Sequence, residues 1–202
     1  MIESIFIGSG FAFAAAVQPG PLQAFLLSKV AQSGWRRTLP ASLAPLLSDI
    51  PIALLMLFFL NNISTAIYGV LKVSGGILLL YYAYLSYRKW SDESSELSAS
   101  QDSGPRTFFQ AALVNILNPN PYLGWSLVLG PAILTAWHRD PADGLALVLA
   151  FYVTMVTTLA CIIILFGTTR FLTSKGHRIL ILSSSVLLAG MGIYQIITGL
   201  IK

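Results

Sequence analysis

The sequence predicts an all-α integral membrane protein: six transmembrane helices arranged as two inverted three-helix repeats, with a broken first helix in each repeat. Three observations lead to this prediction. Of the 202 residues, 55% are hydrophobic and only 10% are charged, which is too little polar surface for a water-soluble globule. The apolar residues fall into six long runs. A proline-rich interruption occurs in the first run and again in the fourth.

Each apolar run is close to or longer than the roughly 20 residues that a helix needs to cross the hydrocarbon core. The runs cover residues 5–28, 38–60, 65–87, 107–135, 143–167 and 179–201. They divide one membrane domain into a first three-helix repeat (1–90), a polar cytoplasmic linker (91–106) and a second three-helix repeat (107–202). Glu3 stands where a signal peptide would have basic residues, so we do not expect cleavage of the first run.

Lys and Arg residues predict the orientation, because basic residues are retained on the cytoplasmic side. The segments after the first, third and fifth runs contain nine of them: Lys29, Arg36, Arg37, Arg88, Lys89, Arg106, Arg170, Lys175 and Arg178. The opposite side has three: Arg139, Lys202 and, just inside the third run, Lys72. Both termini are therefore predicted to lie outside a multi-pass protein of the cell (inner) membrane. The net charge of +4 fits an anionic lipid bilayer, and no nucleic-acid partner is expected.

The interruption of the first run reads Gln-Pro-Gly-Pro at residues 18–21, and Asn-Pro-Asn-Pro follows at residues 118–121. Each repeat crosses the membrane three times, and because this number is odd, the second repeat enters the membrane from the opposite side. Inverted-topology transporters bring such interrupted helices together near the midplane, where they form the binding site. The alternative is that Pro and Gly only kink these helices for packing. The first interpretation predicts a substrate-binding site made of Gln18, Pro19, Gly20, Pro21, Asn115, Asn118, Pro119, Asn120 and Pro121.

Asp49 lies in the middle of the second run, where an ionised carboxylate costs about 2.5 to 3.5 kcal/mol on insertion scales. One interpretation is a proton-coupling or cation site, since apolar burial favours the neutral carboxyl group and lets it exchange a proton. The other is a structural ion pair with Lys72, although that side chain can equally extend to the outer surface. Pro45 and Pro51 flank Asp49 and predict an irregular helix around it.

Other residues are expected to serve packing. Gly75 and Gly76 in the third run, and Gly190 and Gly192 in the sixth, predict close contacts between helices. Cys161 is expected to be a small core residue. No nucleophile with a base, phosphate-binding loop or paired metal motif is present in the sequence, so we expect no enzyme, no catalytic residue, no cofactor and no metal site.

Taken in order along nearly the whole chain, these residues resemble the LysE-type amino-acid exporters, also called the LysE/RhtB group of translocators. The resemblance rests on Pro19-Gly20-Pro21, Gly34, Arg36-Arg37, Asp49, Leu71-Lys72, Gly75-Gly76, Leu79-Leu80-Tyr81 and Asn118-Pro119. It implies a proton-coupled secondary transporter of the inner membrane that exports amino acids or similar small solutes and forms a homodimer. By position, it assigns Pro19, Gly20, Pro21, Asp49, Asn118 and Pro119 to the transport site. Gln18 and Asn120 depart from the family's usual pattern, so the resemblance does not identify the substrate of this chain.

Two alternatives to a solute exporter stay open at this point. A cation exporter would use oxygen ligands from Asp49 and the carboxamides, which suit hard cations better than zinc or cadmium. A non-transporting membrane scaffold predicts that the prolines can be replaced with a loss of stability only.

Overall fold

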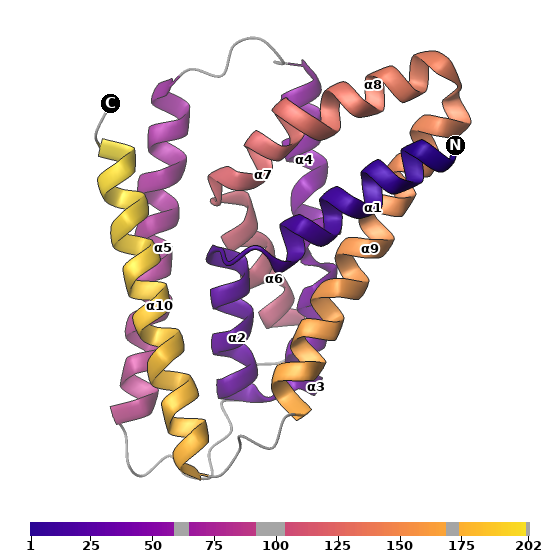
Figure 1. Ribbon diagram of the computed structural model, residues 1–202. Helices are drawn as coiled ribbons and strands as arrows, with labels where there is room; N and C mark the ends of the chain where they lie inside the picture. Colours follow the sequence, from indigo (N-terminus) through magenta and orange to yellow (C-terminus); the bar gives the residue numbers. More distant parts are fainter. Residues whose placement is uncertain (59–64, 92–103, 169–173, 201–202) are drawn as a thin grey trace.

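The computed structural model describes residues 1–58, 65–91, 104–168 and 174–200, and these residues are almost entirely helical (Figure 1). The α-helices are α1 (Ile2–Val17), α2 (Pro21–Ser33), α3 (Trp35–Thr38), α4 (Ala44–Phe58), α5 (Thr65–Ser91), α6 (Gly104–Ile116), α7 (Pro119–Gly124), α8 (Gly130–Arg139), α9 (Pro141–Thr168) and α10 (Ser174–Leu200). A 3₁₀-helix, η1 (Leu39–Leu43), precedes α4, and a π-helix, η3 (Trp125–Leu129), joins α7 to α8. The all-α prediction is confirmed for the described residues.

Helices α5 and α10 run antiparallel side by side and pack more closely than ordinary side chains would allow (Figure 1). A Cβ atom on Gly76 would lie 2.6 Å from the carbonyl oxygen of Gly192, and one on Gly192 would lie 2.8 Å from the carbonyl oxygen of Gly76. These two glycines confirm the predicted close contact. Gly75 packs against the carbonyl of Leu117, in the break between α6 and α7, and against the side chain of Gln195 on α10. Gly190 faces open space, so the prediction is wrong for Gly190.

Helices α1 and α9 form the second close pair (Figure 1). Gly8 of α1 lies against the backbone carbonyl of Leu147 on α9, and a side chain there would collide with it. Nearer the centre of the molecule the rings of Phe11 and Phe151 stack with their centroids 6.3 Å apart. The glycine contact and, about one turn further along α1, the aromatic contact fix the position of α1 on α9.

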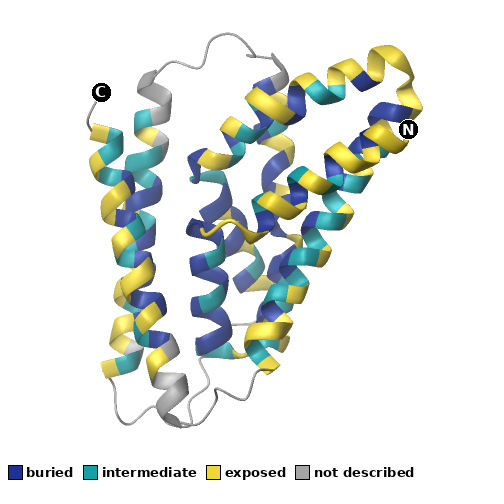
Figure 2. Cartoon of the chain, in the orientation of Figure 1, coloured by how far each residue is buried: buried dark blue, intermediate teal, exposed yellow. Residues whose placement is uncertain are grey.

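Three segments among the described residues are long and apolar enough to cross a membrane: Trp35–Met56, Pro141–Thr168 and Ile181–Leu200. Helices α1 and α2 make a fourth if the pair, bent by 58°, counts as one span. Exposed residues follow one another along the outer faces of α9 and α10 (Figure 2). Many of them are apolar; Val153 of α9, for example, is 65% exposed and Val186 of α10 is 63% exposed. Such surfaces fit a lipid environment. The protein is therefore an integral membrane protein, and the presence of six membrane spans stays a prediction.

Three expectations about local structure are wrong. Helix α4 continues through Pro51 without a break, and the irregular turn lies earlier, at η1, because Pro40 stands there in the first turn. Lys29 belongs to α2 and is buried, so it is not a loop residue. Cys161 is exposed on α9 rather than part of the core, since the other face of that helix packs inward.

Candidate functional site

The first break lies between Val17, the last residue of α1, and Pro21, the first residue of α2. Gln18 and Gly20 have extended backbones there, with φ and ψ of −61° and 125° and of −155° and 177°. In a continuous helix, the carbonyl of Ala15 would bind the amide of residue 19, but proline has none. The break therefore leaves main-chain acceptors without their helical donors.

A side chain supplies the missing donor. The Gln23 carboxamide, in the first turn of α2, reaches back across the break, and its Nε2 donates to the carbonyl oxygens of Ala15 (3.1 Å) and Ala16 (3.0 Å). Buried carbonyls without a partner would be costly in a membrane, so this side chain stabilises the bent conformation.

The second break lies between Ile116, the end of α6, and Pro119, the start of α7. Asn118 caps α7: its Oδ1 accepts a hydrogen bond of 3.1 Å from the amide of Asn120. The hydroxyl of Tyr122 donates to the carbonyl oxygen of Ile116 at 2.9 Å. Both predicted breaks are thus present, and in each a side chain from the following helix binds a carbonyl of the preceding one.

Asp49 is buried on α4, beside the second break. It is 3% exposed, and its Oδ1 accepts a hydrogen bond of 2.8 Å from Nδ2 of Asn115 on α6. The same Nδ2 donates to Oγ of Ser48 at 2.7 Å, and the indole of Trp125 lines the cavity together with Asp49. An acid from the first half of the chain is therefore held by a side chain from the second half.

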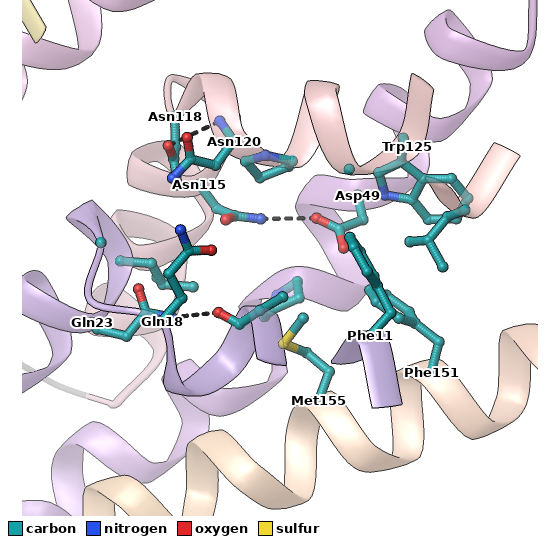
Figure 3. A pocket seen from close by; sticks show the side chains of 17 residues that line it. Phe11, Gln18, Gln23, Asp49, Asn115, Asn118, Asn120, Trp125, Phe151 and Met155 are labelled. Atoms are coloured by element: carbon teal, nitrogen blue, oxygen red, sulfur yellow. Dashed lines mark hydrogen bonds between the residues drawn. The ribbon is translucent and has the colours of Figure 1, made fainter. Parts of the chain in front are cut away.

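A cavity of about 110 Å³ lies between the two breaks (Figure 3). Of the predicted site residues, it is lined by Gln18, Gly20, Asp49, Asn115, Asn118, Asn120 and Pro121. Three further predicted residues, Pro19, Pro21 and Pro119, lie outside the lining and shape the backbone beside it.

The lining has two chemically different ends (Figure 3). We call Gln18, Gln23, Asn118 and Asn120 the amide end. Opposite them lies the acidic end, which we define as Asp49, Trp125, Phe11 and Phe151. The carboxamides of the amide end provide neutral donors and acceptors, and the acidic end combines a carboxylate with aromatic rings.

Lys72 lies elsewhere. Its Nζ donates to the carbonyl oxygen of Thr198 on α10 at 3.5 Å, and it does not line the cavity. Asp49 accepts its hydrogen bond instead from Asn115. The described residues contain no group of three or more His, Cys, Asp or Glu side chains that could hold a metal ion.

The predicted site left out ten lining residues: Phe11, Ala15, Leu22, Gln23, Pro45, Gly124, Trp125, Leu129, Phe151 and Met155. All of them except Gln23 are apolar or aromatic, and such residues carry no signal in a chain that is apolar almost throughout. Gln23 did carry one. It is a carboxamide inside an apolar run, two residues after Pro21, where a break creates acceptors that need a donor.

Comparison with known proteins gives one family match. The family model described as LysE type translocator matches residues 13–199, which is nearly the whole chain. No curated protein and no solved structure matches. The match includes both breaks, Asp49 and all the lining residues except Phe11.

Proposed function

The chain belongs to the LysE type translocator family, and from this premise we propose that it is a proton-coupled secondary transporter that exports amino acids or similar small solutes across the cell membrane. One observation carries the proposal. A single buried carboxylate, Asp49, lies in a cavity between two broken helices that come from different halves of the chain. Inverted-repeat transporters place their substrate and coupling-ion sites in such a position.

The packing of the helices supports two inverted repeats. The first helix of one half, α1, packs on α9 of the other half, and α6 correspondingly packs on α4. The last helices of the two halves, α5 and α10, pack on each other. A twofold axis in the membrane plane would produce this exchange of partners. We therefore keep six spans for the proposal, with α1 and α2 as one bent span and α6, α7 and α8 as another.

The two ends of the cavity suit the two ends of an amino acid. A substrate ammonium would bind at the acidic end, where Asp49 provides opposite charge and the rings of Phe11 and Phe151 can contact its apolar part. The carboxylate would accept hydrogen bonds at the amide end. Pro21 exposes first-turn amides of α2 on the same side, and a helix N-terminus favours an anion.

The coupling of solute export to proton uptake would follow from Asp49 binding either the solute ammonium or a proton. With a solute ammonium bound, Asp49 stays ionised and pairs with it. When the solute leaves to the outside, a proton takes its place, so the buried carboxylate is never left charged and unpaired. Access would alternate as one repeat rocks against the other about the cavity.

The site favours this reading over export of a metal ion. A divalent cation normally takes six or more oxygen ligands with several carboxylates, whereas the cavity lining provides one. Inner-membrane location, termini on the outside and a homodimer remain part of the proposal. The start of α1 and the end of α10 lie at the same end of the molecule, which fits an even number of spans (Figure 1).

The test is proton release from acid-loaded everted vesicles when single amino acids or divalent cations are added outside. We expect release with a subset of amino acids and its loss in Asp49→Asn. Asp140→Asn is the matched control, because Asp140 caps the exposed start of α9 and asparagine can also accept that hydrogen bond. Equal release from wild type and Asp49→Asn would contradict proton coupling through Asp49. Release with cations alone would favour a cation exporter, and solute flux in no condition would favour a scaffold.

A further inference from the structure

The end of α1 lacks two main-chain donors for two different reasons. The carbonyl of Ala15 lacks its helical partner because Pro19 has no amide hydrogen. The carbonyl of Ala16 lacks its partner because Gly20 is extended, and the amide of Gly20 is turned away from the helix axis. Both carbonyls lie where the cavity meets the break.

Gln23 replaces both donors with one side chain. We propose that Gln23 is a positioning residue for the transport site: its carboxamide substitutes for the two missing amides and so holds α1 and α2 at their 58° bend. Its Oε1 remains on the cavity side, where a Cβ atom on Gly20 would approach it to 3.0 Å. A glycine at position 20 therefore leaves the space that the Gln23 carboxamide occupies.

The second break is built differently, which makes the first more dependent on its side chain. Ile116, one hundred residues after Ala16, has its carbonyl bound by the hydroxyl of Tyr122. The carbonyl of Asn115, the counterpart of Ala15, accepts a main-chain hydrogen bond of 3.2 Å from the amide of Asn118. Only at the first break do both carbonyls depend on a single side chain.

The effect on transport rests on the proposed function, but the effect on geometry does not. With both hydrogens of Nε2 committed to α1, loss of Gln23 would free the bend and displace Gln18 and Gly20 relative to Asp49. We therefore expect weaker solute binding without loss of the folded protein. The distance between the two helices should become less well defined.

The experiment uses paired spin labels, one at Phe6 on α1 and one at Arg36 in the short helix α3, which follows α2 after Gly34, in a chain whose exposed cysteine is replaced by Cys161→Ser. Both labelled positions are exposed. Gln23→Leu should broaden the distance distribution, since leucine has no donor for the carbonyls of Ala15 and Ala16. The matched control is Gln32→Leu. It removes a carboxamide at the opposite end of α2 from the break, where Gln32 donates to the hydroxyls of Ser28 and Ser86, and it should leave the distance distribution narrow.

A second background separates positioning from general packing. Pro19→Ala restores an amide that can bind the Ala15 carbonyl, so Gln23→Leu should broaden the distribution much less in that background than in wild type. In vesicles, Gln23→Leu should raise KM about tenfold with a smaller change in maximal rate, the size expected for losing two neutral hydrogen bonds.

Two results would overturn the proposal. One is an unchanged distance distribution in Gln23→Leu; the other is equal broadening by Gln23→Leu in the wild-type and the Pro19→Ala backgrounds. The failure of the proposed function looks different. If wild type moves no solute while the spin-label distances change as expected, Gln23 still positions the helices and the transport assignment is wrong.

Discussion

The Asn115 carboxamide donates a hydrogen bond of 2.8 Å to the Asp49 carboxylate, joining α6 of one half of the chain to α4 of the other. The two residues are 66 positions apart in sequence. Because the same nitrogen also donates to Ser48, both hydrogens of the Asn115 amide are committed to α4. The acid is therefore oriented by a residue from the other half of the chain, and movement of α6 against α4 would change its surroundings.

Replacing Asn115 by Ala should reduce transport more than stability. A hydrogen bond to a charged group contributes about 1.5 to 3 kcal/mol, so we expect a loss of roughly tenfold or more in the rate per folded molecule. The assay is solute-dependent proton release, normalised to protein that elutes as a single species. Gln110→Leu on the same helix is the control, since Oε1 of Gln110 is buried without a hydrogen-bond partner and its removal should cost little. Equal activity of Asn115→Ala and wild type would contradict this role.

Gly76→Ala should destabilise the pair α5–α10, because the added Cβ would lie 2.6 Å from the Gly192 carbonyl oxygen. Overpacking of this kind costs about 1 to 3 kcal/mol. Thermal unfolding in detergent should show a lower Tm. Gly190→Ala on α10 is the matched control, as nothing lies within 4 Å of its Cβ position. A Tm that falls equally in both variants would mean that the loss comes from glycine replacement itself.

Gly8→Ala tests the contact between α1 and α9 in the same way. Its Cβ would collide with the Leu147 carbonyl, whereas Gly10, half a turn further along α1, has open space around it. We expect Gly8→Ala to lower both Tm and transport, since α1 ends at the cavity, and Gly10→Ala to change neither. If Gly10→Ala were as harmful as Gly8→Ala, flexibility of α1 rather than its close packing would be the relevant property.

Met155→Trp should block the cavity without unfolding the protein. Met155 lines the 110 Å³ cavity, and a larger ring there would take space that a solute needs. The expected result is a loss of solute-dependent proton release with Tm within a few degrees of wild type. Met155→Leu, similar in volume, should retain transport. Full activity of the Trp variant would place the solute elsewhere.

Cys161 provides a test of the lipid-facing surface. Its thiol is exposed on α9, which is long and apolar enough to span the bilayer. In sealed vesicles a charged, membrane-impermeant maleimide should therefore leave it unmodified, because a charged reagent does not enter the hydrocarbon core. After the protein is unfolded in denaturant the thiol should react. Rapid modification in intact vesicles would place this part of α9 in water.

The sequence predicts the site better than it predicts the surroundings of the site. Proline has a local effect that is independent of the rest of the fold, so both breaks could be placed from residues 18–21 and 118–121. Asp49 and Asn115 stand out for the opposite reason: in an apolar chain a polar residue needs a partner. The inverted arrangement then predicts that these residues converge, and they line one cavity.

What remained unpredicted depends on tertiary packing. The orientation of Lys72 toward Thr198, rather than toward Asp49, follows from the pairing of α5 with α10, which sequence spacing does not specify. Gly190 and Gly192 look alike in sequence, yet only Gly192 lies at the crossing point of the two helices. The burial of Lys29 likewise depends on α2 continuing to Ser33 beside neighbouring helices.

The contact between Gly76 and Gly192 is reciprocal, since each residue's carbonyl fills the space that the other's missing side chain leaves. Gly69 and Gly199 repeat this relation, each with the partner's carbonyl 3.0 Å from its Cβ position. Symmetric homodimers make such self-complementary contacts between identical copies. Helices α5 and α10 of one polypeptide thus meet in the way that identical helices meet across the interface of a symmetric homodimer.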